Sequence, residues 1–169
     1  MSEHPRYAAF QHVAVMTDGS ARAWGYNAYG ALGFNTSTTN QPFWASSTEL
    51  PLPHGTVVKR AWNSYLSTFL LDTNNVLWSS GYYYSQPDNM SNGSASTRFF
   101  PLTSVTDIGD DEIVELKGGY SANTYSGQDP SFLLRTASGK VYAWGGNYAT
   151  CLGLGTGTIT VPTLIPFTA

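Results

Sequence analysis

A short phrase that the chain repeats three times limits its fold more than any other feature of the sequence. The phrase begins at Gly19, returns at Gly139 and survives in a weaker form at Asn75. This spacing matches one small β-sheet per repeat rather than a pair of helices. We therefore predict an all-β fold, a partial β-propeller of about three four-stranded antiparallel blades with no substantial helix. The chain would form one domain, residues 1–169, with repeats at approximately 7–60, 61–125 and 126–169.

Each copy predicts a β-hairpin that ends in a corner of tight backbone. In the first copy the hairpin turns at Asp18-Gly19, the Asp-Gly signal that positive φ favours. Asn75 replaces this glycine in the middle copy, because asparagine tolerates left-handed backbone better than other residues with a side chain. The positions to which we assign a structural role in the repeat are Gly19, Trp24, Gly25, Gly33, Trp78, Gly81, Gly139, Trp144, Gly145 and Gly153.

Further strands complete the predicted blades. The segments 56–62 and 111–119 alternate apolar and polar side chains, and each leads into the next hairpin. Extended segments flanked by proline lie at 41–43, 100–102 and 161–164. Proline suits an outer strand, so we expect these segments at the outer edges of the blades.

Several positions of the copies agree with a known repeat. The first copy carries Thr17-Asp18-Gly19, Trp24-Gly25, Asn27 and Gly30-Ala31-Leu32-Gly33, and the third carries Val141-Tyr142, Trp144-Gly145, Asn147 and Leu152-Gly153. Over nearly the whole chain these copies resemble the repeats of the regulator of chromosome condensation family. The third copy departs from the pattern by placing Thr150 where the loop glycine belongs. The resemblance implies a propeller, which in that family closes seven blades within one polypeptide.

The predicted blade count leaves an open arc. Such an arc exposes two blade faces, and exposed apolar faces and free strand edges invite further pairing. The chain could be a fragment, pack against other copies, or dock on a larger assembly. The start at Met1 and the loose ending at 167–169 favour a complete short chain that assembles. Closed symmetry is the usual form of such assemblies.

Composition argues against several classes of protein. The formal net charge is −3, and the 8 lysines and arginines are scattered singly, so no basic stripe is available for nucleic acid. Nothing after Met1 resembles a secretion signal, and no apolar run approaches the ~18 residues that cross a bilayer. The single cysteine, Cys151, cannot form an internal disulfide, and its place in a repeat turn predicts a small buried side chain.

The sequence contains no arrangement that predicts catalysis, a metal ion or a cofactor. His4, His12 and His54 share no zinc-type spacing with Cys151, and the G-x-S-x-G nucleophile motif is absent. The glycine-rich run 152–158 lacks the lysine and helix start of a phosphate loop, so we interpret it as a turn of the repeat. Four acidic residues predict a solvated turn before a strand rather than a calcium loop: Asp107, Asp110, Asp111 and Glu112.

Aromatic residues are the best candidates for binding. Tyr82, Tyr83 and Tyr84 replace the family loop in the middle copy, and Trp44 and Phe99 follow the loops at comparable places. Consecutive side chains alternate in direction, so we expect at least one of the tyrosines to face solvent or a partner. Exposed tyrosine and tryptophan suit both protein contacts and sugar stacking. Packing of these aromatics between blades is the open alternative.

The interpretation that follows is a non-enzymatic structural or adhesive module. We expect a phage virion or tail component that assembles through its blades and contacts a host surface. The alternatives are a fragment of a larger propeller acting as an interaction scaffold of the nucleotide-exchange type, which the resemblance implies, and a carbohydrate-binding module. The expected partners are copies of itself, virion or scaffold proteins, and a host-surface glycan or protein, without nucleic acid or membrane insertion. The expected location is the virion for a phage protein and otherwise the cytoplasm.

Overall fold

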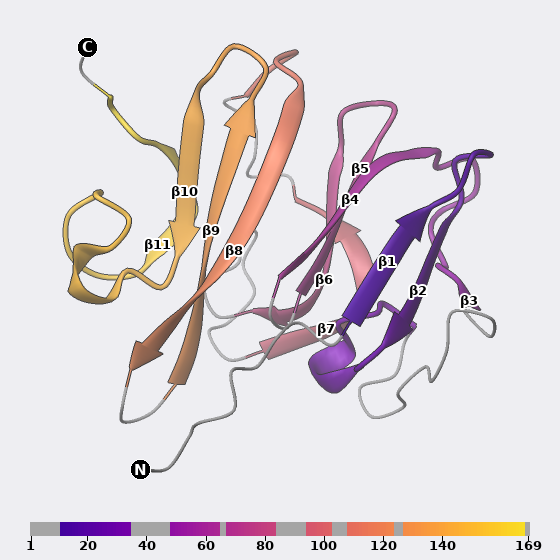
Figure 1. Cartoon of the computed structure of the whole chain (residues 1–169), viewed down its shortest axis with the longest axis horizontal. Helices are drawn as coiled ribbons and strands as arrows, with labels where there is room; N and C mark the ends of the chain where they lie inside the picture. The colour runs from indigo at the N-terminus through magenta and orange to yellow at the C-terminus, as the bar shows by residue number, and fades with distance from the viewer. Residues whose placement is uncertain are drawn as a thin grey trace.

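Three antiparallel sheets stand side by side in the computed structural model of the chain (Figure 1). The structure describes residues 11–34, 48–64, 67–83, 94–102, 108–123 and 127–167. The first sheet has the order β1-β2-β3, the second β4-β5-β6-β7 and the third β11-β10-β9-β8. The strands are β1 Gln11–Val15, β2 Ala21–Gly25, β3 Thr48–Glu49, β4 Val58–Ser64, β5 Ser67–Asp72, β6 Leu77–Tyr83, β7 Ser94–Pro101, β8 Ile113–Asn123, β9 Gly127–Thr136, β10 Val141–Gly145 and β11 Ile159–Leu164. The predicted all-β class and its blade-like sheets are confirmed.

Helical structure is limited to single turns in the part of the chain that the structure describes. Two 3-10 turns, η1 at Ala28–Gly30 and η3 at Tyr148–Thr150, follow the Trp-Gly corners of the first and third repeats. Within the same residues, no helix has the length and apolar character that crossing a membrane requires.

The three predicted hairpins form as the repeated phrase indicates. In the first, β1 pairs with β2 so that His12 lies opposite Trp24. Gly19, Asn75 and Gly139 occupy the same place in the three turns, with φ of 82°, 64° and 88°. The expectation that Asn75 stands in for a left-handed glycine is therefore confirmed.

Two details of the predicted repeats differ from the structure. The strand at 58–64 pairs with β5, and the strand at 113–123 pairs with β9, so these strands begin the second and third sheets. The sheets therefore begin before the approximate repeat limits at 60 and 125, because an antiparallel strand joins the neighbour that a short connection reaches. In addition, the described part of the first sheet has three strands, since no counterpart of β4 or β8 precedes β1 there. The outer segment predicted at 41–43 lies outside the described residues.

Two hydrophobic cores fill the spaces between the sheets. The core between the first and second sheets contains Ala21, Ala23, Leu32, Leu50, Val58, Leu70 and Phe99. The core between the second and third sheets contains Phe69, Leu71, Leu77, Leu102, Ile108, Ile113, Leu116, Phe132, Leu134, Tyr142 and Trp144. The aromatic rings of Phe69, Phe132 and Trp144 contact one another in this second core. Each sheet thus packs face to face on the next, as propeller blades do.

The sheets also approach one another closely through strands that lie at their facing edges. The side chain of Gln11 in β1 donates hydrogen bonds to the backbone oxygens of Ser64 and Ser67, at 2.6 and 3.1 Å. Between β4 and β8, a Cβ added to Gly118 would overlap the hydroxyl of Ser64. Glycine at 118 is therefore required by the packing of the second sheet against the third.

Candidate interaction surfaces

A corner glycine, preceded by tryptophan in the first and third repeats and by Ser80 in the second, fixes the backbone at the end of each hairpin. Gly25, Gly81 and Gly145 have φ of 102°, 107° and 105°, a conformation that side chains disfavour. At Gly145 an added Cβ would also overlap the backbone oxygen of Pro130. The corner is therefore structural, and it places the following loop at the edge of the sheet.

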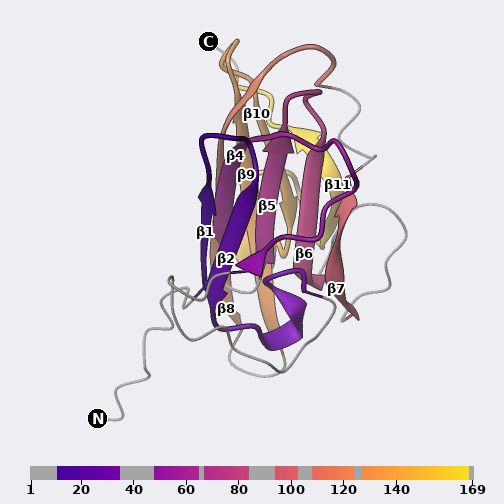
Figure 2. The same ribbon diagram turned by 90° about the vertical axis from the view of Figure 1, so that its right-hand side faces the viewer.

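The loop after the first corner is held by a buried asparagine. Asn27 is fully buried, and its side-chain oxygen accepts a hydrogen bond of 2.9 Å from the backbone N–H of Leu32. This loop, residues 27–34, packs on the second sheet (Figure 2). Its backbone oxygen at Ala31 accepts a hydrogen bond of 3.0 Å from Ser80, and the ring of Tyr29 lies 4.7 Å from that of Tyr82.

The loop after the third corner has the same internal bonds, but among the described residues no further sheet packs on it. The side-chain oxygen of Asn147 accepts a hydrogen bond of 2.9 Å from the backbone N–H of Leu152. In Figure 1 the loop, residues 147–158 in yellow, lies at the side of the third sheet that faces away from the others. It borders a hollow of ≈ 380 Å³, lined by Asn147, Tyr148, Ala149, Thr150, Thr156, Gly157 and Thr158.

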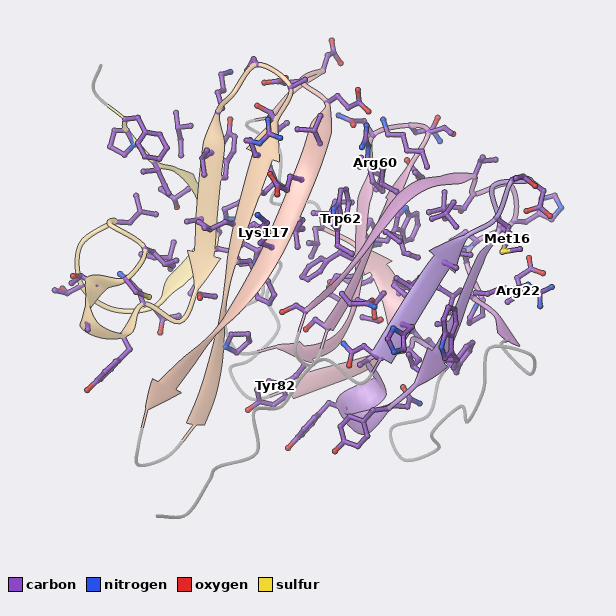
Figure 3. All side chains as sticks on the ribbon, in the orientation of Figure 1. Met16, Arg22, Arg60, Trp62, Tyr82 and Lys117 are labelled. Atoms are coloured by element: carbon purple, nitrogen blue, oxygen red, sulfur yellow. The ribbon has the colours of Figure 1, made fainter. Side chains whose placement is uncertain are left out.

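A group of aromatic, sulfur-containing and basic side chains occupies the outer face of the first sheet. Val13 and Val15 pack into the core toward the second sheet, so their neighbours along β1 face the opposite way. We call this group the first-sheet patch, and it consists of His12, Met16, Arg22, Trp24 and Tyr26. Figure 3 shows the side chains of Met16 and Arg22 on this outer side.

The first-sheet patch combines stacked rings with exposed side chains. The rings of His12 and Trp24 stack 5.5 Å apart, and Met16 and Tyr26 are 42% and 43% exposed. By contrast, Trp144, which matches Trp24 in the third repeat, is fully buried between the second and third sheets. One position of the repeat is therefore core in the third sheet and surface in the first.

The outer face of the third sheet combines exposed apolar side chains with ion pairs. Leu133 is 42% exposed on this face, beside a shallow hollow of ≈ 180 Å³. Glu115 pairs with Lys117 at 2.8 Å and with Arg135 at 3.2 Å. Hydrogen bonds from Lys117, and secondly from Arg135, hold the pKa of the Glu115 carboxyl below its ordinary value. These exposed pairs contribute little to stability, but they make this face more polar than the cores.

The aromatic residues predicted to bind lie in different surroundings. Tyr82 is partly buried against Tyr29, and Phe99 is 9% exposed in the core between the first and second sheets. The structure places the backbone of Tyr83 in β6, while Tyr84 and Trp44 lie outside the described residues. Tyr82 and Phe99 thus make contacts between sheets, and a binding role for the five residues stays a prediction.

Cys151 is exposed, so the expectation of a buried thiol is wrong. Its counterpart Ala31 in the first loop is fully buried, because the second sheet covers that loop. Repeat position alone therefore does not decide burial; a neighbouring sheet does.

No metal-binding group of histidine, cysteine, aspartate and glutamate occurs among the residues that the structure describes. In the predicted acidic turn, Asp111 accepts hydrogen bonds from the backbone N–H and the hydroxyl of Ser138. The hydroxyls of Ser138 and Thr136 lower the pKa of Asp111. This carboxylate therefore joins the end of the β9–β10 hairpin to the segment before β8.

The sequence did not predict Asn27, Asn147 and Tyr26 as site residues. The two asparagines recur at one place in the repeat, which was the available signal for their role in the loops. For Tyr26 the available signal was its correspondence to Tyr82 in the second repeat, although the third copy has Gly146 at this place.

Together the sheets and the loops define an RCC1-type β-propeller arrangement. Human WBSCR16 matches it with a TM-score of 0.67 at 19% identity, over 93% of this chain and 37% of that protein. Prp20p from Saccharomyces cerevisiae matches with a TM-score of 0.65 at 18% identity, over 94% and 36%. Yeast RCC1 (Prp20), in a structure with Kap60, matches with a TM-score of 0.65 at 18% identity, over 94% of this chain and 35% of that chain.

The likeness supports the fold that the repeats implied. This chain spans little more than a third of the length of these proteins, as the 37%, 36% and 35% coverage states. No protein-family model matches the sequence, and a search of curated proteins found no match.

Proposed function

We propose that this chain is a non-enzymatic protein-interaction scaffold that binds proteins through the first-sheet patch. The observation that carries the proposal is the exposure of repeat positions that the third sheet buries. Trp24 and His12 lie on the surface, whereas their counterparts Trp144 and Phe132 are fully buried. A surface built from core positions is suited to contact another protein.

The composition of the patch supports protein binding. Tryptophan, tyrosine and arginine are the residues most enriched among those that dominate binding energy at protein interfaces. Trp24 and Tyr26 offer large areas with few rotatable bonds; Trp24 lies in β2 opposite His12, and Tyr26 follows the end of that strand. The patch therefore combines the residue types and the rigidity that an interface requires.

The similar structures favour the scaffold interpretation over the phage one. They are RCC1-type propellers, and they lend no support to a virion role, a virion partner or a glycan. The virion component and the carbohydrate-binding module therefore do not enter the proposal.

The similar proteins suggest the first partners to test. The Prp20p structure is described with binding to Gsp1p and histones, and the yeast RCC1 (Prp20) structure with Kap60. For this chain, Gsp1p, histones and Kap60 are candidates, tested as binding partners without any requirement for nucleotide exchange.

The test is binding of the purified chain to each immobilised candidate by biolayer interferometry. We expect saturable binding to at least one candidate and a dissociation constant about tenfold higher for Trp24→Ala, the lower range of an interface residue of this kind. Tyr26→Ala provides a second variant at an exposed position, and His54→Ala, in an exposed turn, is the control that should bind as the native chain does. Circular dichroism melts verify that each variant is folded. Binding to none of the candidates, or equal binding by both patch variants, would contradict the proposal.

A further inference from the structure

We propose that the loop after the third corner, residues 147–158 and here called the third loop, is a docking surface for the first sheet of a second copy of this chain. Tyr26 and Trp24 of that copy would take the places that Tyr82 and Ser80 take beside the first loop. The inference rests on the proposed function, because it names a second copy as one protein partner of the first-sheet patch, which competes for the patch with any heterologous partner.

The two loops have the same backbone. The N–H of residue 30 or 150 donates to the oxygen of residue 27 or 147 at 3.1 Å in both loops. Tyr29 and Gly30 have φ of 57° and 73°, and their counterparts Ala149 and Thr150 have φ of 52° and 58°. Holding Thr150 left-handed costs free energy that a glycine would avoid, so the matching conformation is imposed by the repeat.

Within the chain, the first loop shows what such a backbone binds. It contacts the third and fourth strands of the next sheet, β6 and β7. Ser80 donates a hydrogen bond to its backbone, and Tyr82 packs on Tyr29. The ring of Phe99 lies so close to Gly33 that an added Cβ would overlap it. The first loop is therefore a contact surface for the neighbouring sheet.

The third loop has the same backbone as the first loop, but none of the described residues packs on it as the second sheet packs on the first loop. Tyr148 is 56% exposed, and Cys151 is exposed where Ala31 is fully buried. Around Gly153 an added Cβ would meet no atom within 4 Å, in contrast to its counterpart Gly33. The third loop therefore presents open space at the positions that the second sheet fills in the first loop.

The first sheet carries aromatic side chains at the positions that contact the first loop in the second sheet. Counted from the Trp-Gly corner, Tyr26 corresponds to Tyr82 and Trp24 corresponds to Ser80. The third loop has Ala149 where the first loop has Tyr29, and the hollow beside it measures ≈ 380 Å³. Trp24 is thus larger than its counterpart Ser80, and the third loop offers the smaller Ala149 and open space beside it.

The same contact would cover the outer face of the third sheet. Leu133 corresponds to Phe69, which packs in the core between the second and third sheets, yet Leu133 is 42% exposed. A contact of this kind joins different surfaces of the two copies, so it is head-to-tail and can close into a ring. Two copies would give six blades, within the usual range of four to eight, so we expect a dimer.

The test is sedimentation velocity over a concentration series of the full chain. We expect a shift from the 18.3 kDa monomer to twice that mass. Tyr26→Ala and Cys151→Arg should each raise the dimer dissociation constant about tenfold or more. The control is His54→Ala, in an exposed turn outside both surfaces, which should associate as the native chain does.

Mixing the two variants distinguishes head-to-tail contact from a symmetric one. A Tyr26→Ala chain keeps its third loop, and a Cys151→Arg chain keeps its first-sheet patch, so the mixture retains one intact contact per pair. We expect the mixture to associate more strongly than either variant alone. A monomer at every concentration, or a dimer that both variants leave unchanged, would overturn the inference. Binding of a heterologous protein by a strictly monomeric chain would overturn the inference and leave the proposed function standing.

Discussion

At the scale of single residues, Asp111 links acid stability to the contact between two segments of the third sheet. Hydrogen bonds from the hydroxyls of Ser138 and, secondly, Thr136 lower the pKa of this carboxyl from its ordinary value of 3.8. A carboxyl with a lowered folded pKa stabilises the fold above its unfolded pKa, and this contribution is lost as pH falls through the folded pKa.

We therefore predict that Asp111→Asn makes the melting temperature less sensitive to acid between about pH 5 and about pH 3. Thermal melts followed by circular dichroism at a series of pH values measure this dependence. Asp110→Asn changes the adjacent exposed carboxyl and should keep the native dependence on pH. Parallel curves for Asp111→Asn and the native chain would show that Asp111 makes no such contribution.

Residues whose role depends on local backbone could be predicted from the sequence. Asn75 adopts the left-handed conformation that its alignment with two turn glycines predicts. Cys151 could not be predicted, because its exposure depends on whether a sheet lies beside its loop. Tyr26 was missed for the same reason: exposure of a repeat position is decided by distant parts of the chain.

At the scale of strands, the closest approach of two sheets lies between β4 and β8. Gly118→Ala would bring a methyl group onto the hydroxyl of Ser64, so one of the two strands would have to shift. We predict a loss of about 1–3 kcal/mol in the free energy of unfolding, the usual cost of overpacking. Urea denaturation followed by tryptophan fluorescence measures this loss. Gly119→Ala is the control, since the nearest atom to its Cβ is the Ser131 hydroxyl at 3.2 Å, and it should cost less.

The hairpins and the strands that precede them could be predicted because alternation and turn residues specify them locally. The sequence predicted less well that β4 belongs to the second sheet and β8 to the third. An alternating strand can pair with either neighbouring sheet, and the alternation does not say which. The short strand β3 at 48–49 has too few residues to give an alternating pattern.

At the scale of the whole molecule, the three described sheets bury two interfaces, and no other described residues form a sheet on the outer face at either end. The first-sheet patch lies on one end, and the third loop lies on the other. In the proposed dimer, the end faces of two copies pack on each other as neighbouring sheets do within the chain. The chain thus carries both halves of a blade contact, which is the basis of the proposed scaffold and its dimer.

The reactivity of Cys151 tests this account most directly, since the native chain has a single cysteine within the third loop. The measurement is the rate of reaction with a thiol reagent as the protein concentration is raised. We predict rapid reaction in dilute solution and progressive protection as the second copy covers the loop, with no protection in Tyr26→Ala. An equal rate at every concentration, or a thiol that is unreactive even in dilute solution, would contradict the account.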